Sequence, residues 1–152
     1  MQQKDLFYDK IKHYVEFNLN TLMKQNISEL AETIYRLKEQ NDTIIGMHFA
    51  RVFKKAILNE QKFYVPIHRE SRKKINPLIR QIDDKKYLIV FSDFAFVRIF
   101  ENSDAITMKM PQILQILEHD EDIYGISLNT FHKEYSVEIN RRNFSNIWKF
   151  QV

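Results

Sequence analysis

Ser92 and Asp93 carry the most suggestive chemistry, because they follow directly on the apolar run at residues 87–91. That run is rich in β-branched and aromatic residues, as expected of a strand buried on both faces. A serine in the turn after such a strand holds the position of a hydrolase nucleophile. That turn uses flanking glycines, whereas Phe91 and Phe94 flank Ser92-Asp93 here. We therefore predict that Ser92 or Asp93 caps a helix at 94–100, and we predict no catalytic residue. A hairpin is the alternative, because apolar residues also alternate there.

Metal and cofactor chemistry finds little support in the other residue types. No cysteine is present, which excludes disulfides, thiol nucleophiles and cysteine metal sites. The five histidines have no mutual spacing of three or four residues, so they form no helical metal pair. His119 lies in the acidic run 118–122, but a calcium loop alternates its ligands with spacers and needs a glycine. We expect a solvated acidic loop there, no metal ion and no cofactor.

Glycine occurs only twice, as Gly46 and Gly125. Phosphate-cradling loops need several glycines so that the backbone can approach the anion, so neither a P-loop nor a dinucleotide fingerprint can be assembled. The eleven asparagines are expected to supply many of the left-handed turn conformations instead.

Positive charge is concentrated in one part of the chain. Residues 44–81 carry nine basic and two acidic side chains, whereas residues 82–140 carry five and eleven. The candidate partner-binding residues of this basic region are Arg51, Lys54, Lys55, Lys62, Arg69, Arg72, Lys73 and Lys74. We expect either a solvated face or a surface for an acidic protein partner. Nucleic acid is the less favoured partner: Phe63 and Tyr64 could stack on bases, but no RNA-binding motif is present.

Residues 1–42 are predicted to form a helical extension. Apolar residues at helical spacing predict an amphipathic helix at 4–25 and a second one at 27–40. Asn26, with a glutamate three residues later, offers a capping signature between them. The two helices would form a hairpin that either packs on the domain at 43–152 or projects as a docking or homodimerisation arm.

The rest of the chain alternates between helix and strand patterns. A cap at 41–43 precedes a helix at 44–59, Pro111 begins another, and a closing helix covers 141–150. Strands are predicted at 63–67, 78–82, 86–92, 106–108, 124–129 and 135–140. The first three have short connections, which favours an antiparallel meander, and Pro66 is expected near a strand end or sheet edge. The fold class is α+β, with a mostly antiparallel or mixed central sheet of about five to six strands packed with helices.

A family pattern runs through residues 45–150. Its blocks are FARVFKKAIL at 49–58, FYVPI at 63–67, YLIVFSD at 87–93, PQILQIL at 111–117 and YGISLN at 124–129. In this order they resemble the N-terminal domain of the SseB-like family, named for a bacterial enhanced-serine-sensitivity protein. One departure is Thr130-Phe131, which stands where family members often place proline after the asparagine. The resemblance implies a small bacterial α/β domain and brings no catalytic residues.

The function expected from these features is that of a non-enzymatic bacterial interaction module. It would bind a protein through the basic region at 51–74, through the N-terminal helices, or through both. A nucleic-acid-binding accessory protein that uses the same basic region is the alternative. The chain begins with charges where a signal peptide needs an apolar core, and no apolar run approaches the roughly 18 residues of a membrane span. We therefore expect a cytoplasmic protein without membrane contact.

Overall fold

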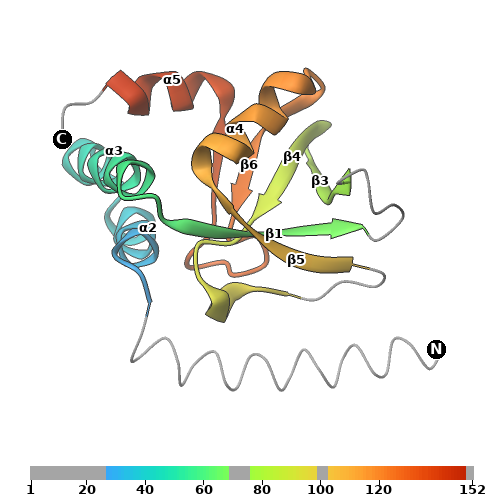
Figure 1. Ribbon diagram of the computed structural model, residues 1–152. Coiled ribbons are helices and arrows are strands. Elements are labelled where there is room, and N and C mark those ends of the chain that lie inside the picture. Colours follow the sequence, from blue (N-terminus) through green and yellow to red (C-terminus); the bar gives the residue numbers. More distant parts are fainter. Residues whose placement is uncertain (1–26, 69–75, 99–102, 150–152) are drawn as a thin grey trace.

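The computed structural model describes residues 27–68, 76–98 and 103–149, and it has an α+β fold (Figure 1). The helical elements are α2 (Glu29–Gln40), α3 (Thr43–Leu58), η1 (Phe94–Phe96), α4 (Met110–His119) and α5 (Arg141–Lys149). The strands are β1 (Lys62–His68), β2 (Asn76–Pro77), β3 (Ile79–Ile82), β4 (Lys85–Val90), β5 (Ser103–Lys109), β6 (Ile123–Leu128) and β7 (Val137–Asn140). They form two sheets, in the orders β2-β1-β5 and β3-β4-β6-β7. The predicted α+β class is confirmed, while the helix predicted at 4–25 lies outside the described residues.

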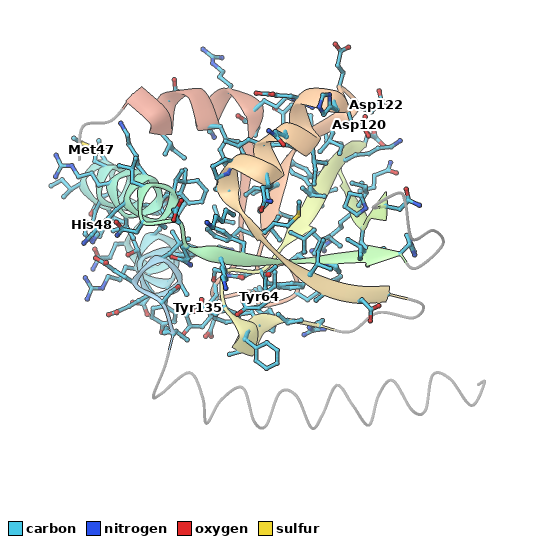
Figure 2. All side chains as sticks on the ribbon, viewed as in Figure 1. Met47, His48, Tyr64, Asp120, Asp122 and Tyr135 are labelled. Atoms are coloured by element: carbon cyan, nitrogen blue, oxygen red, sulfur yellow. The ribbon has the colours of Figure 1, made fainter. Side chains whose placement is uncertain are left out.

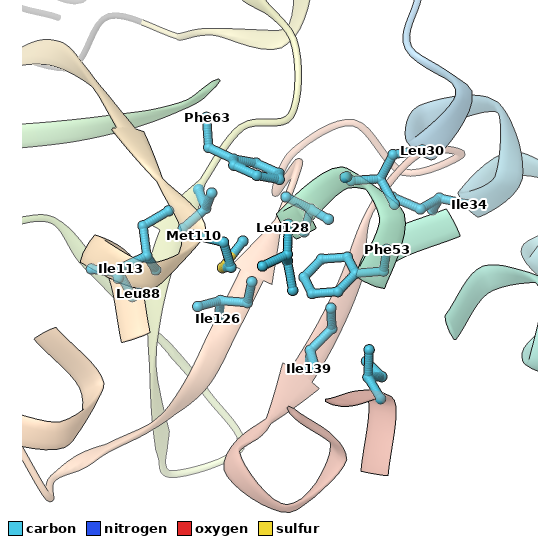
Figure 3. Close-up of a cluster of buried hydrophobic side chains, with 14 of the residues drawn as sticks. Leu30, Ile34, Phe53, Phe63, Leu88, Met110, Ile113, Ile126, Leu128 and Ile139 are labelled. Atoms are coloured by element: carbon cyan, nitrogen blue, oxygen red, sulfur yellow. The ribbon is translucent and has the colours of Figure 1, made fainter. Parts of the chain in front are cut away.

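The strand β4 is central to the larger sheet and has a core on each side. It pairs antiparallel with β3 and parallel with β6. Leu88 and Val90 belong to the main core, whereas Ile89 and Phe91 belong to a second, smaller core. Figure 3 shows Leu88 in the main core together with Phe53 of α3. The prediction of a strand buried on both faces is therefore confirmed.

The connections on either side of β4 follow from simple chain geometry. A two-residue turn joins β3 to β4, and its residues Asp83 and Asp84 have φ values of 49° and 65°, as a type I′ hairpin turn requires. Because β4 and β6 run parallel, the chain must cross over between them, and it does so through η1, β5 and α4. The strand β5 is longer than the predicted 106–108, and Pro111 lies in the first turn of α4 as predicted.

The predicted meander is confirmed for its second and third strands, which pair antiparallel as β3 and β4, and it is wrong for the first strand. The strand β1 pairs with β2 and β5 in the smaller sheet. It meets the end of β4 only at one bridge, where Tyr64 N donates to Phe91 O at 2.9 Å and Phe91 N donates to Tyr64 O at 2.8 Å. Pro66 lies near the end of β1, as predicted, but β1 is a middle strand and not a sheet edge. Its missing N–H falls between the Phe91 bridge and the β2 pairing, where β1 changes partners.

The helix predicted at 94–100 is also wrong. Only the three residues of η1 form a 3-10 turn, after which Val97 is extended, and the alternative hairpin does not form within 94–98 either. Phe94 is 74% exposed, whereas Phe96 is buried in the second core. Asp93 precedes η1 but makes no side-chain hydrogen bond to it. Its carboxylate serves another helix instead, as described below.

The helices α2 and α3 lie side by side and share the main core (Figure 1). The cap of α2 is Ser28, not the predicted Asn26, because Ser28 Oγ accepts a hydrogen bond from Ala31 N at 3.2 Å. The cap of α3 is Asp42 as predicted, and its Oδ1 accepts from Ile45 N at 2.8 Å.

The C-terminal strands β6 and β7 form the predicted antiparallel pair, followed by α5. Gly125 lies opposite Asn140 at a point of close backbone approach. A Cβ at position 125 would lie 2.7 Å from Asn140 Cα and closer still to the carbonyl oxygen of Ile139. Only glycine fits here without a shift of β7. Ile147 of α5 then closes one side of the main core.

Candidate functional site

The outer side of α3 combines exposed apolar and basic side chains. This stripe, which we call the α3 face, comprises Ile44, Met47, Arg51, Lys55 and Leu58. Steps of three and four residues place these positions on one side of the helix. Ile44 is 79% exposed and Leu58 is 56% exposed. Figure 2 shows Met47 at the outer edge of the molecule. Clustered apolar side chains at a surface mark sites of interaction, so the α3 face is the leading candidate for a partner-binding surface.

Only four of the eight basic residues predicted to bind a partner lie in the described part of the chain. Arg51 and Lys55 are exposed on the α3 face, and Lys54 is half-buried beside it. Lys62 is exposed at the start of β1, past the C-terminal end of α3. The other four, outside the described residues, are Arg69, Arg72, Lys73 and Lys74. The structure therefore brings Arg51 and Lys55 together on α3 and places Lys62 on the strand that follows.

Little negative charge balances α3. Its sixteen residues contain no aspartate or glutamate. Lys55 Nζ lies 3.9 Å from Glu29 Oε2 of α2, but both side chains are more than half exposed, so the pair is worth little. Arg51 forms no ion pair with any described carboxylate. The α3 face therefore presents positive charge to solvent.

The apolar members of the α3 face were not among the predicted binding residues. The core stripe of this helix includes Phe49, Val52 and Phe53, which are buried. Ile44 and Leu58 fall on the opposite side of the same helix. Apolar residues off the core stripe are the signal that could have found this surface.

Ser92 and Asp93 belong to a hydrogen-bond network that joins α2 to the ends of β4 and β6. Asn129 Oδ1 accepts from Ser92 N at 2.8 Å, and Asn129 Nδ2 donates to Ser92 Oγ at 2.9 Å and to Tyr135 O at 3.2 Å. Ser92 Oγ donates to Asp93 Oδ2 at 2.6 Å. The Asp93 carboxylate also accepts from the backbone N of Ser28 at 2.9 Å and from its hydroxyl at 2.8 Å. Asp93 thus fastens the start of a helix that is distant in sequence.

The environment of Ser92 is that of a structural hydroxyl. The residue is 3% exposed, and its Oγ already donates to Asp93 and accepts from Asn129. His132, three residues after Asn129, is also buried, and its Nε2 lies 2.7 Å from Phe96 O. Because a carbonyl oxygen can only accept, Nε2 carries the proton and donates it. Among the described residues, no histidine nitrogen is hydrogen-bonded to Ser92 Oγ. The general base that activates a serine nucleophile is therefore not in place here.

Two tyrosines have raised pKa values because the fold buries their rings. Burial is the largest cause of the raised pKa of Tyr87, and the nearby ammonium of Lys85 opposes it. Burial is also the largest cause of the raised pKa of Tyr135, and the carboxylate of Glu134 adds to it. Both shifts arise from packing, and neither phenol lies on the α3 face.

A groove of about 620 Å³ lies between α4, β5 and the β2–β3 segment. Its apolar lining includes Pro77, Ile79 and Ile116, and His119 and Asp120 from the predicted acidic loop line it as well. The described residues contain no group of three or more histidine, aspartate or glutamate side chains placed to hold a metal ion. None of the described helices combines the length and apolar character that a membrane span requires. The groove has the size of a small-molecule site, but no such metal-binding group accompanies it in the described residues.

The surfaces described above are the basis for a functional proposal, because comparisons with known proteins identify no relative of this chain. No protein-family model, no curated protein and no solved structure matches the chain. The resemblance to the SseB-like family therefore stays a prediction.

Proposed function

We propose that this chain is a bacterial, cytoplasmic interaction module of SseB-like type that binds an acidic protein partner through the α3 face. The observation that supports this most is the exposure of Ile44 and Leu58 at the two ends of a positively charged helical stripe. A single exposed apolar side chain is ordinary on a protein surface. Several on one helix face, with arginine between them, have the composition of a protein contact.

Charge complementarity supports an acidic partner. Arg51 and Lys55 lie between the exposed apolar residues, and α3 itself has no carboxylate. An amphipathic helix with acidic flanks could cover Ile44 and Leu58 with apolar side chains and place carboxylates against Arg51. Such a partner would associate faster at low salt, because opposite charges steer the encounter.

Nucleic acid is the less supported alternative. Phe63, considered above as a base-stacking group, is fully buried in the main core and cannot stack on a base. Tyr64 is half-buried, and its ring packs edge-on against Phe94 with the centroids 5.9 Å apart. The α3 face also places apolar side chains where nucleic-acid interfaces are strongly polar and positively charged.

Homodimerisation through the N-terminal helices is a separate hypothesis. The helix α2 buries Leu30 and Ile34 in the main core, as Figure 3 shows. Its apolar stripe is therefore already occupied within one copy of the chain. A homodimer contact of this kind would have to use the residues that precede α2, which lie outside the described part of the chain.

The test compares two variants of the α3 face with two matched controls elsewhere. Arg51→Glu reverses a charge on the face, and Lys86→Glu makes the same change at an exposed position of β4. Leu58→Ser removes an exposed apolar side chain from the face, and Ile79→Ser does so in the groove. Proteins captured from a bacterial lysate by the tagged wild-type chain are identified by mass spectrometry, and the recovered partner is titrated against each variant by calorimetry.

The proposal predicts an acidic protein that binds the wild type and both controls alike. Arg51→Glu and Leu58→Ser should each weaken its binding about tenfold or more, as expected for residues at the centre of a contact. Equal binding of all four variants would refute the assignment to α3. Loss of binding in Ile79→Ser alone would move the site to the groove. Binding of single-stranded DNA that Arg51→Glu abolishes and Leu58→Ser leaves intact would favour the nucleic-acid alternative.

A further inference from the structure

Phe131 lies on the surface beside two arginines from other parts of the chain. The guanidinium carbon of Arg80, on β3, is 4.7 Å from the centre of the Phe131 ring. That of Arg98, which follows η1, is 5.2 Å from the same ring centre. The Phe131 side chain is nevertheless 44% exposed. We call these three side chains the Arg–Phe–Arg cluster.

The loop that carries Phe131 is held at both ends. Asn129, fully buried, binds Ser92 and Tyr135 through its side-chain amide. His132 is buried as well, and its ring packs against Phe96 with the centroids 5.0 Å apart. Side chains fixed in this way lose little freedom on binding, so the loop offers a preorganised surface.

Both arginines are also fixed in place by the loop. Arg80 Nη1 donates to Thr130 Oγ1, and Arg98 Nη2 donates to Phe131 O at 3.4 Å. The two guanidinium groups lie no more than about 10 Å apart, because both are near one ring centre. Arg80 is half-buried and forms no ion pair with a described carboxylate. A guanidinium has five N–H donors, so Arg80 keeps most of them for an external anion.

The backbone of Phe131 is strained. Its φ of 72° lies in the left-handed region, where a bulky residue is an outlier. Strain of this kind concentrates at ligand clamps and binding sites, where the surrounding structure enforces it. Glycine or asparagine would adopt the same backbone more readily. The position therefore holds a large aromatic ring against the local preference of the backbone.

We propose that the Arg–Phe–Arg cluster is a binding site for a carboxylate side chain in an acidic segment of a partner protein. The planar fork of an arginine matches a carboxylate through two parallel hydrogen bonds. An apolar side chain next to that carboxylate would cover the exposed part of the Phe131 ring. Arginine and aromatic residues dominate the energy of protein contacts, which favours a peptide over a free anion.

This site is separate from the α3 face, and the inference goes beyond the proposed function. The helix α2 lies between the two surfaces. On one side it packs against α3, and on the other Lys38 Nζ donates to Lys133 O in the loop that follows Phe131. A change on the α3 face should therefore leave the Arg–Phe–Arg cluster intact, and the two proposals can fail independently.

The test selects short random peptides displayed on phage against the full wild-type chain. Recovered peptides are synthesised and titrated against wild type, Arg80→Gln, Arg98→Gln and Phe131→Gly. We expect enrichment of aspartate or glutamate next to an apolar residue. Arg80→Gln or Arg98→Gln should weaken binding about tenfold to a hundredfold, the range expected for a charge-assisted hydrogen bond. Replacement of the peptide's acidic residue by its amide should weaken binding to the same extent.

Matched variants keep the result interpretable. Arg80→Lys retains the charge without the fork and should also bind weakly. Phe131→Gly relieves the backbone strain, so loss of binding in this variant cannot be ascribed to unfolding when its thermal midpoint is retained. Phe94→Ala and Arg51→Glu should bind as wild type does. Recovered peptides without acidic enrichment, or peptides that bind the two glutamine variants normally, would overturn the proposal. The proposal would also be overturned if no peptide binds and an oligothymidine probe binds tightly to the wild type but not to these variants.

Discussion

Glycine at position 131 should give a more stable protein than alanine at the same position. Both substitutions remove the Phe131 ring and its contacts with Arg80 and Arg98. Only alanine keeps a Cβ on a backbone with a φ of 72°. At exposed positions with ordinary backbone angles the order is the reverse, because glycine loses more conformational freedom on folding.

The size of the effect follows from two opposing terms. A left-handed backbone costs a residue with a Cβ about 1–2 kcal/mol, and glycine avoids this cost. Glycine gives back about 0.5–1 kcal/mol through its larger loss of backbone entropy. Phe131→Gly should therefore exceed Phe131→Ala in unfolding free energy by about 0.5–1 kcal/mol. In the wild type, two exposed cation–π contacts of about 0.5–1 kcal/mol each offset the strain, whereas Phe131→Gly keeps its entropy loss, so the wild type should exceed Phe131→Gly in unfolding free energy by about 0.5–1 kcal/mol.

The measurement is urea unfolding followed by circular dichroism, with the midpoint and slope determined for each variant. The control is the same pair of substitutions at Phe94, which is 74% exposed and has a negative φ. There alanine should be the more stable by about 0.5–1 kcal/mol. If alanine is the more stable at both positions, Phe131 carries no left-handed strain. A link between the backbone of Phe131 and ligand binding would then be refuted.

Three further changes test the fold around this loop. Asn129→Ala should lower the unfolding free energy by about 3 kcal/mol or more, because it leaves buried polar groups of Ser92 unpaired. A loss below about 1 kcal/mol in urea unfolding would contradict the hydrogen-bond network. Gly125→Ala should lower the unfolding free energy by about 1–3 kcal/mol, because a Cβ at this position meets the backbone of β7. An unchanged thermal midpoint would contradict that contact. The raised pKa of Tyr135 favours the protonated phenol in the folded state, so stability should be full below about pH 10 and fall above it. Tyr135→Phe should make that alkaline fall shallower in urea unfolding at stepped pH, and an identical fall would contradict the shift.

Elements specified by nearby residues were predicted well from the sequence. The helix α3 follows from the cap Asp42 and the spacing of its buried apolar residues. The strand β4 follows from an apolar run too continuous to leave either face in water. The β3–β4 hairpin follows from Asp83 and Asp84, which tolerate the left-handed angles of a two-residue turn. In each case the decisive interactions join residues close in sequence.

Elements decided by distant residues were not predicted. The partner of β1 is β5, some forty residues later, so no local pattern reveals the pairing. The segment after Ser92 has helical spacing. The Asp93 carboxylate, however, accepts hydrogen bonds from Ser28, 65 residues earlier, and does not cap a helix. Only a short 3-10 turn follows it. The exposed apolar residues of the α3 face were overlooked because the core stripe of the same helix accounts for its pattern. Arg80 and Arg98 meet at Phe131 only through the tertiary fold.

The left-handed residues of this chain show why Phe131 stands apart. Among the described residues, those with positive φ are Asn41, Glu60, Asp83, Asp84, Asn129 and Phe131. Four of these are asparagine or aspartate, whose short polar side chains tolerate this region, as the scarcity of glycine led us to expect for asparagine. Glu60 follows the end of α3, where a left-handed residue is common. Phe131 has no such local reason, and its ring is too exposed to be needed by the core. A bulky ring in a left-handed backbone beside two cations is the arrangement from which we proposed the carboxylate-binding site.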